Sequence, residues 1–216
     1  MSFTDRQQAG ERLAEKLTAY RGCDAVLLGL ARGGVVVAST LASRFRQSTD
    51  VCVVKKIGSP VDAELAIGAV APDGVSYVDW RLGHRTGADE HFIRTQITEL
   101  NDQIRQKTLL YRKGKRPYQL RDKTVIVVDD GAATGATLEA AIKWLRVKKV
   151  KKIVVALPVA PPDVVARIKP EVSELVVLET PNDFQSVGQY YQKFPQVEDG
   201  EVIKLLALSN QPSAVS

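Results

Sequence analysis

The sequence contains few of the residues that build disulfide frameworks or metal centres. Among its 216 residues there are two cysteines, two histidines and one methionine. Cys23 and Cys52 lack the paired spacing of a zinc or redox motif and lie in or beside apolar runs, so we expect packed, unpaired thiols. His84 and His91 have no cysteine at ligand spacing, which favours packing or surface roles over metal binding. This composition fits a reducing, cytoplasmic setting.

Long apolar segments are also missing from the sequence. No apolar run approaches the roughly 20 residues that a membrane-spanning helix needs, and the first residues lack the apolar stretch of a secretion signal. We therefore expect an untargeted chain without a membrane partner. With 44% hydrophobic and 25% charged residues the composition is that of a globular protein, and the length suits one domain over 1–216.

An excess of acidic residues is absent too, since the formal net charge is +5. The basic residues are scattered along the chain, and only 112–116 and 148–152 are dense in them. A nucleic-acid-binding protein normally concentrates its basic residues on one face or along one helix. The distribution therefore disfavours a nucleic-acid partner and favours small anionic ligands.

The sequence does contain a regular alternation of short apolar runs with amphipathic segments. Apolar and β-branched runs predict strands, and apolar residues that recur every three or four positions predict helices. The expected strands are 25–30, 50–54, 66–70, 75–78, 124–128, 153–156 and 174–178, and the expected helices are 4–20, 35–44, 88–112, 138–146, 163–168 and 202–208. Strands that alternate with helices predict an α/β fold with a central, mostly parallel sheet flanked by helices. A local antiparallel hairpin is expected around 71–74, and a helical insertion over about 84–116.

The strand predicted at 124–128 ends in two acids that are followed only by small residues and hydroxyls. The segment runs Asp129, Asp130, Gly131, Ala132, Ala133, Thr134, Gly135, Ala136 and Thr137. Small residues leave the backbone N–H groups and the start of the next helix open to a phosphate, and the hydroxyls add donors. Carboxylates beside an anion site are explained by contacts to sugar hydroxyls or to a hydrated Mg²⁺. The residues therefore predict a sugar-phosphate site.

This pattern resembles the signature of the type I phosphoribosyltransferases, whose donor is 5-phosphoribosyl-1-pyrophosphate. It differs from a Walker A loop, which ends in Gly-Lys and a hydroxyl residue, and from the GxGxxG fingerprint of dinucleotide-binding folds. The resemblance implies that residues 129–137 bind this donor. It also implies the family's α/β fold, in which a small hood, here about 1–20 and 180–210, covers the site.

Two further segments match the family's pattern. Ala31, Arg32, Gly33 and Gly34 follow an early strand, where family members carry a loop for the pyrophosphate group. Glycines permit close backbone approach and Arg32 supplies positive charge. Lys55 and Lys56 end the next strand, at a position where family members place a basic residue on the pyrophosphate. Either lysine could make that contact, and 55–60 is interpreted as a loop because of its glycine, serine and proline.

Additional motifs resemble a little-characterised bacterial and archaeal subfamily of predicted phosphoribosyltransferases. They lie at 3–6, 56–60, 64–69, 129–137 and 187–191, so the match extends over nearly the whole chain. The resemblance implies a donor, a fold and a homodimer, but it names no acceptor.

The acceptor is the least defined part of the prediction. Phe184, Tyr190 and Tyr191 are candidate hood residues that could stack on a flat ring, and core packing is an equally supported alternative. Relatives that act on 6-oxopurines carry an aspartate in the phosphate loop where this sequence has Ala133. The resemblance therefore argues against hypoxanthine and guanine, and a nucleobase of another type is one candidate.

The resemblance implies a transfer of phosphoribose with release of pyrophosphate. Mg²⁺, Arg32 and one of the two lysines would neutralise the leaving group, while Asp129 and Asp130 would hold the ribose hydroxyls. No residue is assigned as a direct metal ligand, because Mg²⁺ is expected to bind mainly through the donor with the two acids nearby. Residues 58–64 are a candidate lid that excludes water.

Two other functions stay open. A regulator that binds the donor without turnover would keep the same phosphate loop, and a hydrolase or phosphatase acting on a related sugar phosphate is a third possibility. The loop offers no obvious nucleophile for a hydrolase, and the sequence shows no helix-turn-helix pattern. Retention of both acids together with Arg32 and the lysines favours the transferase.

Overall fold

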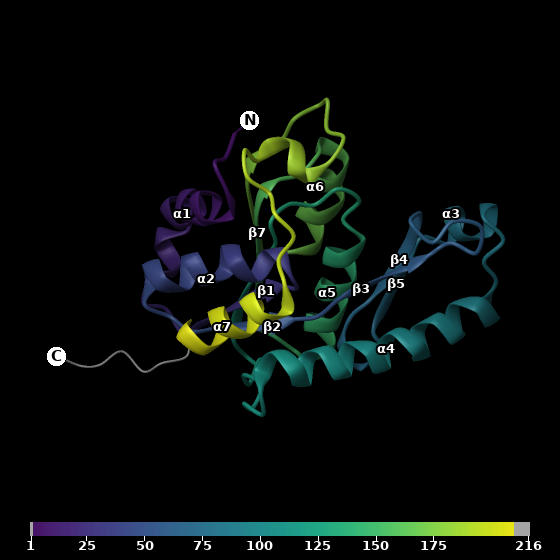
Figure 1. The fold of residues 1–216 in the computed structure, drawn as a ribbon, viewed down its shortest axis with the longest axis horizontal. Helices are drawn as coiled ribbons and strands as arrows, with labels where there is room; N and C mark the ends of the chain where they lie inside the picture. The colour runs from purple at the N-terminus through teal and green to yellow at the C-terminus, as the bar shows by residue number, and fades with distance from the viewer. Residues whose placement is uncertain (1, 210–216) are drawn as a thin grey trace.

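A parallel sheet forms the centre of the molecule (Figure 1). The structure is a computed structural model that describes residues 2–209, so residue 1 and residues 210–216 of the predicted domain, including the predicted end of the hood, lie outside the described residues. The five strands are ordered β2-β1-β6-β7-β8 and comprise β1 (Ala25–Leu30), β2 (Thr49–Cys52), β6 (Thr124–Val128), β7 (Lys152–Val159) and β8 (Glu174–Glu179). All neighbouring pairs are parallel, which confirms the predicted α/β class.

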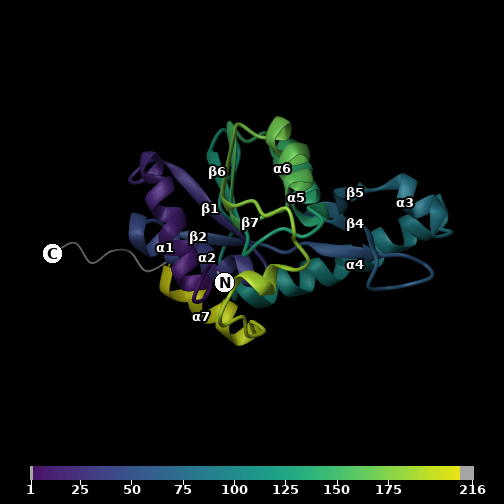
Figure 2. The same cartoon turned by 90° about the horizontal axis from the view of Figure 1, so that it is seen from above.

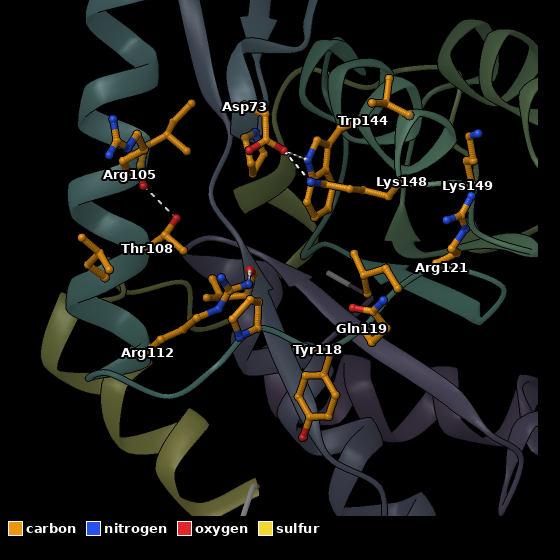
Figure 3. A pocket seen from close by; sticks show the side chains of 17 residues that line it. Asp73, Arg105, Thr108, Arg112, Tyr118, Gln119, Arg121, Trp144, Lys148 and Lys149 are labelled. Atoms are coloured by element: carbon orange, nitrogen blue, oxygen red, sulfur yellow. Dashed lines mark hydrogen bonds and ion pairs between the residues drawn. The ribbon is translucent and has the colours of Figure 1, made fainter.

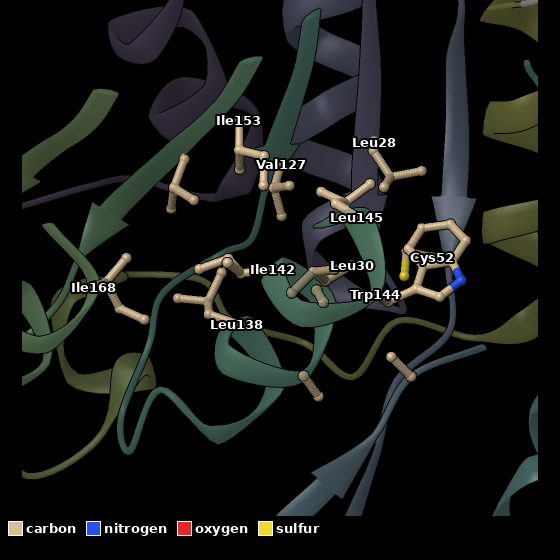
Figure 4. Packing of buried hydrophobic residues seen from close by; sticks show 14 of the residues in the cluster. Leu28, Leu30, Cys52, Val127, Leu138, Ile142, Trp144, Leu145, Ile153 and Ile168 are labelled. Atoms are coloured by element: carbon tan, nitrogen blue, oxygen red, sulfur yellow. The ribbon is translucent and has the colours of Figure 1, made fainter. Parts of the chain in front are cut away.

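Helices cover both faces of this sheet, with α1 and α2 on one side and α5 and α6 on the other (Figure 2). The described helices are α1 (Arg6–Lys16), α2 (Gly33–Phe45), α3 (Trp80–Arg85), α4 (Glu90–Arg112), α5 (Ala136–Val147), α6 (Pro162–Ile168) and α7 (Asp199–Ser209). Leu27 and Ile126 pack against the side of α1 and α2, whereas Leu28 and Val127 pack against α5 (Figure 4). Successive side chains of a strand point to opposite faces, so neighbouring residues serve two separate cores. Because these strands are buried on both faces, their sequences are continuous apolar runs.

A second, antiparallel sheet extends from the end of β2 and forms an arm beside the central sheet (Figure 1). Its three strands are ordered β3-β4-β5 and comprise β3 (Lys55–Gly58), β4 (Ala66–Val70) and β5 (Ser76–Val78), with α3 and α4 packed along it. One prediction is therefore wrong: residues 55–58 are not a loop. The segment forms a strand because its backbone pairs with β4 and because Ile57, next to the two lysines, is fully buried.

The long helix α4 is fixed at both ends by acidic side chains. Asp89 accepts the N–H of Phe92 at 2.7 Å and caps the helix, which explains why it begins after the predicted residue 88. At the other end the guanidinium of Arg112 donates to both oxygens of Asp50, at 2.9 and 2.8 Å. Asp50 is buried in β2. Arg112 therefore attaches the arm to the central sheet.

The first residues and the segment after β8 lie together. Phe3 forms a parallel bridge with Tyr191, and the backbone N–H of Phe3 donates to the carbonyl of Tyr190 at 2.9 Å. Helix α7 then packs against α2 and α4.

The two cysteines differ in their exposure. Cys52 is buried as predicted, but the prediction for Cys23 is wrong, since Cys23 lies exposed in the turn before β1. Within residues 2–209 no helix has both the length and the apolar character that crossing a bilayer requires.

Candidate active site

Two loops meet at the carboxyl ends of the neighbouring strands β1 and β6. Gly29 lies opposite Val128 in the parallel register, so the chain leaves both strands at the same edge of the sheet. The first loop passes through Ala31 and Arg32, joined by a cis peptide bond, into α2. A Cβ atom on Gly34 would lie 2.5 Å from the carbonyl oxygen of Val128. Glycine is therefore required for the two loops to approach each other.

The other glycine of the first loop faces one of the two acids. A Cβ atom on Gly33 would lie 1.9 Å from Oδ2 of Asp130, where no side chain could be accommodated. The sequence assigns these glycines to the close approach of a ligand, and the structure adds the close approach of the second loop. Loops 31–34 and 129–135 therefore form one continuous surface.

Asp130 is held by a basic residue that the sequence interpretation gave no role. The Nε atom of Arg6 donates to Oδ2 of Asp130 at 2.7 Å. The same guanidinium donates to the carbonyl of Pro195 at 2.8 Å and lies 3.7 Å from the ring centroid of Phe194. Arg6 is buried, and burial of an arginine normally requires such a set of partners. Its place in the 3–6 motif was the available signal, but nothing in that motif indicates Asp130.

Asp129 has a different environment from its neighbour. Burial raises the pKa of Asp129 well above its usual range, and the negative charge of Asp130 raises it further. The N–H of Asp130 donates to Oδ1 of Asp129 at 2.9 Å, and this bond and the charge of Lys56 act in the opposite direction. One acid is thus paired with a cation, while the pKa of the other is raised by burial and by the charge of its neighbour.

The candidate phosphate loop leads into α5 and contains two glycines with positive backbone φ angles. Gly131 has φ of 151° and Gly135 has φ of 76°, and a Cβ atom on Gly131 would lie 2.6 Å from the side chain of Val187. Ala133 and Thr134, between them, are exposed. The 12-residue helix α5 starts directly afterwards, so its unpaired N–H groups lie beside an exposed loop. This arrangement is typical of an anion site.

Arg167 from α6 reaches this loop and was not predicted. Its Nη2 donates to the carbonyl of Thr134, and its guanidinium lies 3.4 Å from Asp163 and 3.6 Å from Glu139. It also stands beside Gly135, where a Cβ atom would lie 3.0 Å from Nη2. Arg167 therefore shapes the start of α5. A lone arginine in a short helix carries no sequence signal for such a role.

The two lysines of β3 are not equivalent. Lys55 and the buried Ile57 share one face of the strand, whereas Lys56 points to the other face and is exposed. The charge of Lys56 is the one that lowers the pKa of Asp129. Of the two lysines, Lys56 is therefore the one whose charge acts on Asp129.

Arg32 lies close to the start of α7. Its Nη1 atom is 3.9 Å from a carboxylate oxygen of Glu198 and 3.9 Å from one of Asp199. Asp199 also pairs with Lys107 of α4 and accepts the hydroxyl of Tyr111 at 2.7 Å. These two hydrogen bonds lower the pKa of Asp199. The candidate pyrophosphate-binding arginine is thus tied to a network that joins α4 and α7.

The candidate hood aromatics divide into two environments. Tyr191 is 3% exposed, its ring stacks on Phe194 at a centroid distance of 4.8 Å, and its hydroxyl donates to the carbonyl of Asp130 at 2.6 Å. This hydrogen bond connects Tyr191 to the backbone of loop 129–135. Phe184 and Tyr190 stack on each other at 5.6 Å and are half-buried. Of the three, these two retain accessible ring surface.

The comparison with known families agrees with this geometry. The family model described as the phosphoribosyl transferase domain matches residues 3–192, which include both loops and the arm. The chain belongs to the phosphoribosyltransferase family. The predicted family membership is confirmed.

Relatives of this phosphoribosyltransferase-family chain are found among curated and solved proteins. A protein of Mycobacterium tuberculosis H37Rv, named as a presumed phosphoribosyl transferase, is 39% identical over 208 residues. That match covers 94% of this chain and 46% of the relative, and the same holds for its counterpart from strain CDC 1551. The chain therefore spans about half the length of the curated relatives it matches.

Solved structures support the same fold. The crystal structure of TT1426 from Thermus thermophilus has 38% identity and a TM-score of 0.79, covering 95% of this chain and 98% of that chain. A hypothetical protein from Neisseria gonorrhoeae, solved with bound ppGpp, has a TM-score of 0.54 and covers 97% of this chain and 96% of that chain at 17% identity. The second likeness shows the fold alone.

Proposed function

We propose that this chain is a phosphoribosyltransferase that binds 5-phosphoribosyl-1-pyrophosphate between loops 31–34 and 129–137. It would transfer the phosphoribosyl group to an acceptor and release pyrophosphate. One observation carries the proposal: Gly33 and Gly34 bring the first loop onto Asp129 and Asp130 directly beside the start of α5. A phosphate, a polyhydroxyl sugar and a diphosphate each find suitable partners there.

Each part of the donor has a proposed contact. The exposed backbone of Ala133 and Thr134, with Thr137 in the first turn of α5, would hold the sugar phosphate. Asp129 and Asp130 would accept hydrogen bonds from the ribose hydroxyls, with Asp130 oriented by Arg6.

The leaving pyrophosphate would lie against the backbone of 31–34. Arg32 supplies one positive charge there, and Lys56 is favoured over Lys55 because its charge already acts on Asp129. Cations placed where charge develops lower the barrier to departure of the leaving group.

Mg²⁺ fits this site as an ion bound mainly through the donor. Among residues 2–209 no group of three or more His, Cys, Asp or Glu side chains is placed to hold a metal. Mg²⁺ commonly binds through one or two carboxylates together with substrate phosphates. Asp129 is the available carboxylate, since Asp130 is paired with Arg6. When bound, Mg²⁺ would supply neutralising charge to the pyrophosphate.

The acceptor is proposed to be a small molecule other than a 6-oxopurine, and a nucleobase of another type is one candidate. Phe184 and Tyr190 are the proposed stacking residues, because the ring of Tyr191 is covered. Ala133, exposed in the phosphate loop, offers no carboxylate for proton transfer to a 6-oxopurine ring.

A cytoplasmic location and a homodimer stay predictions. Sedimentation equilibrium would test whether the chain forms a homodimer.

A binding protein without turnover is the second candidate. The neisserial protein of the same fold was solved with ppGpp bound, so this fold can hold a phosphorylated ligand in a protein with no named activity. In the present chain the carboxylates 3.9 Å from Arg32 compete for the charge that a pyrophosphate needs. A regulator would bind the donor at this site and retain it.

The deciding experiment incubates the chain with Mg²⁺, labelled donor and a panel of nucleobases and small amines. Pyrophosphate release that depends on one acceptor supports the transferase, while donor binding without release across the panel supports the regulator. Asp129→Asn should abolish release. The matched control is Asp122→Asn, an exposed aspartate with φ of 61° that asparagine tolerates well. Absence of donor binding by the wild type would refute both candidates.

A further inference from the structure

A cavity of about 720 Å³ is lined by residues of α4 and of the end of α5 (Figure 3), and no residue of loops 31–34 and 129–137 lines it. Its walls come from the second half of α4, from residues 117–121, and from residues 144–149 at the end of α5 and just after it. Residues 117–121 lead into the amino end of β6, and α5 leads into the amino end of β7, whereas the donor loops follow carboxyl ends. The cavity is therefore separate from the candidate active site. Its volume is in the range of small-molecule sites.

The lining of this cavity is strongly basic. It includes five cationic side chains and one carboxylate, that of Asp73. Asp73 is already engaged, because it lies 2.8 Å from Nζ of Lys148 and accepts the indole N–H of Trp144 at 2.9 Å. Arg112 is likewise engaged by Asp50. The remaining positive charge of the cavity is not matched by its own acids.

Three cations remain for a ligand: Arg105, Arg121 and Lys149. Within residues 2–209 the one carboxylate that Arg105 approaches is that of Asp102, at 4.0 Å, and the Arg105 side chain is 74% exposed. Arg121 and Lys149 form no ion pair with a carboxylate in the part of the chain that the structure describes. Cations that line a concave surface favour phosphate, which accepts several charge-assisted hydrogen bonds.

Apolar side chains flank these cations. Leu109 on α4 and Val147 on α5 line the cavity and are 70% and 62% exposed, which is high for residues of this type. Pro72 and Pro117 add flat apolar surface, and Thr108 and Gln119 add hydrogen-bonding groups. A ligand with an apolar ring and an anionic group would cover both kinds of surface.

We propose that this cavity binds a nucleoside phosphate as a second ligand, distinct from the donor. The phosphate would contact Arg121 and Lys149, and the base would lie between Leu109 and Val147. Inorganic phosphate would leave the apolar walls exposed, and an uncharged nucleoside would leave the cations unpaired.

Such a ligand is placed to influence the donor site. One side of α4 lines the cavity through Thr108 and Arg112, while Lys107 and Tyr111 of the same two turns bind Asp199. Asp199 in turn lies 3.9 Å from Arg32. A ligand that shifts these turns would therefore alter the partners of Arg32.

The test uses the whole chain with AMP as the probe, and adenosine and inorganic phosphate as partial probes. Calorimetry measures affinity, and photolabelling with 8-azido-AMP followed by peptide mapping locates the site. We expect label in 104–112, 117–121 or 144–149. Arg121→Ala combined with Lys149→Asn should weaken AMP binding about tenfold or more. Asparagine is chosen because φ of Lys149 is 56°.

The matched control is Lys115→Ala, which removes a nearby exposed lysine that does not line the cavity, and we expect its AMP affinity to stay within about twofold of the wild type. If the double variant fails to fold, Leu109→Trp provides a second readout, because AMP should quench a tryptophan at this exposed position.

Three results would overturn the proposal. The first is label confined to 31–34 and 129–137, and the second is equal affinity for adenosine and AMP. The third is a dimer of the wild type that is unaffected by AMP and is dissociated by Leu109→Asp. That result would show that the cavity is a contact surface between two copies of the chain. None of these readouts uses the donor, so the proposal can fail independently of the transferase assignment.

Discussion

The Nε atom of Arg6 lies 2.7 Å from Oδ2 of Asp130, although 124 positions separate the two residues in the chain. Their side chains are 9% and 15% exposed. No cation of the described residues forms an ion pair with the adjacent Asp129, whose pKa is raised by burial and by the charge of Asp130. Two neighbouring acids with the same side chain are thus given different environments, which suits different roles in binding a donor.

Replacing Arg6 by methionine should destabilise the fold by about 3 kcal/mol, because it leaves a mostly buried carboxylate without its partner. Urea unfolding measures the change. Arg44→Met is the control, since Arg44 and Glu11 form a similar 2.7 Å pair with side chains that are 59% and 37% exposed. We expect that control to cost less than about 1 kcal/mol. Equal losses in both variants would show that burial of the first pair has no energetic consequence.

Gly33→Ala should abolish donor binding while leaving the chain folded. The added methyl would lie 1.9 Å from Oδ2 of Asp130, so the carboxylate and the loop around it must move. Gly200→Ala is the matched control in α7, where a Cβ atom meets nothing within 4 Å. Alanine should stabilise that helix by up to about 1 kcal/mol. Donor affinity by calorimetry and unfolding by circular dichroism check both variants, and unchanged affinity in Gly33→Ala would contradict the loop geometry.

The stability of the chain should depend on the ionisation of Asp129. Its pKa is raised above the ordinary value of 3.8, so the folded chain holds a proton that the unfolded chain has released. This contribution to stability is complete below about pH 4 and is lost as the pH rises through the folded-state pKa. Asp129→Asn cannot ionise, so its free energy of unfolding should fall less over that interval than that of the wild type.

Urea unfolding at a series of pH values measures this difference. Asp122→Asn should retain the wild-type dependence of the free energy of unfolding on pH. Asp122 is exposed and lies before β6, at the opposite end of that strand from Asp129 and Asp130. Parallel curves for the wild type and Asp129→Asn would contradict the raised pKa.

Lys56→Met should weaken donor binding about tenfold, whereas Lys55→Met should change it by less than about threefold. Lys56 acts electrostatically on Asp129, while Lys55 shares its strand face with the buried Ile57. Titration of each variant with the donor measures both affinities. The assignment fails if Lys55→Met produces the larger loss.

Much of the central fold is readable from local sequence. The apolar runs that became β1 and β6 are long enough and buried enough on both faces to predict strands without tertiary information. The small-residue loop after β6 is also local, because Gly131 and Gly135 occupy positive φ angles that few other residues adopt.

The arm was less predictable. The segment Lys55–Gly58 contains a glycine and precedes serine and proline, which are loop residues, yet it pairs with β4 and forms a strand. Strand formation there depends on a partner strand beyond an intervening loop and on burial of Ile57, and neither is visible in a short window. The burial of Cys23 was predicted wrongly for a related reason. An apolar run that begins two residues later does not determine whether the turn before it is exposed.

The family, the α/β class and the candidate phosphate loop could be predicted from the amino-acid sequence, because they depend on residue types and on their spacing within short segments. Three relationships became visible only in the folded chain: Arg6 pairs with Asp130, the charge of Lys56 acts on Asp129, and Asp199 lies beside Arg32. Each of these contacts joins segments that are far apart in the chain. Charges interact through distance in space, and that distance is set by how the sheet and its helices pack.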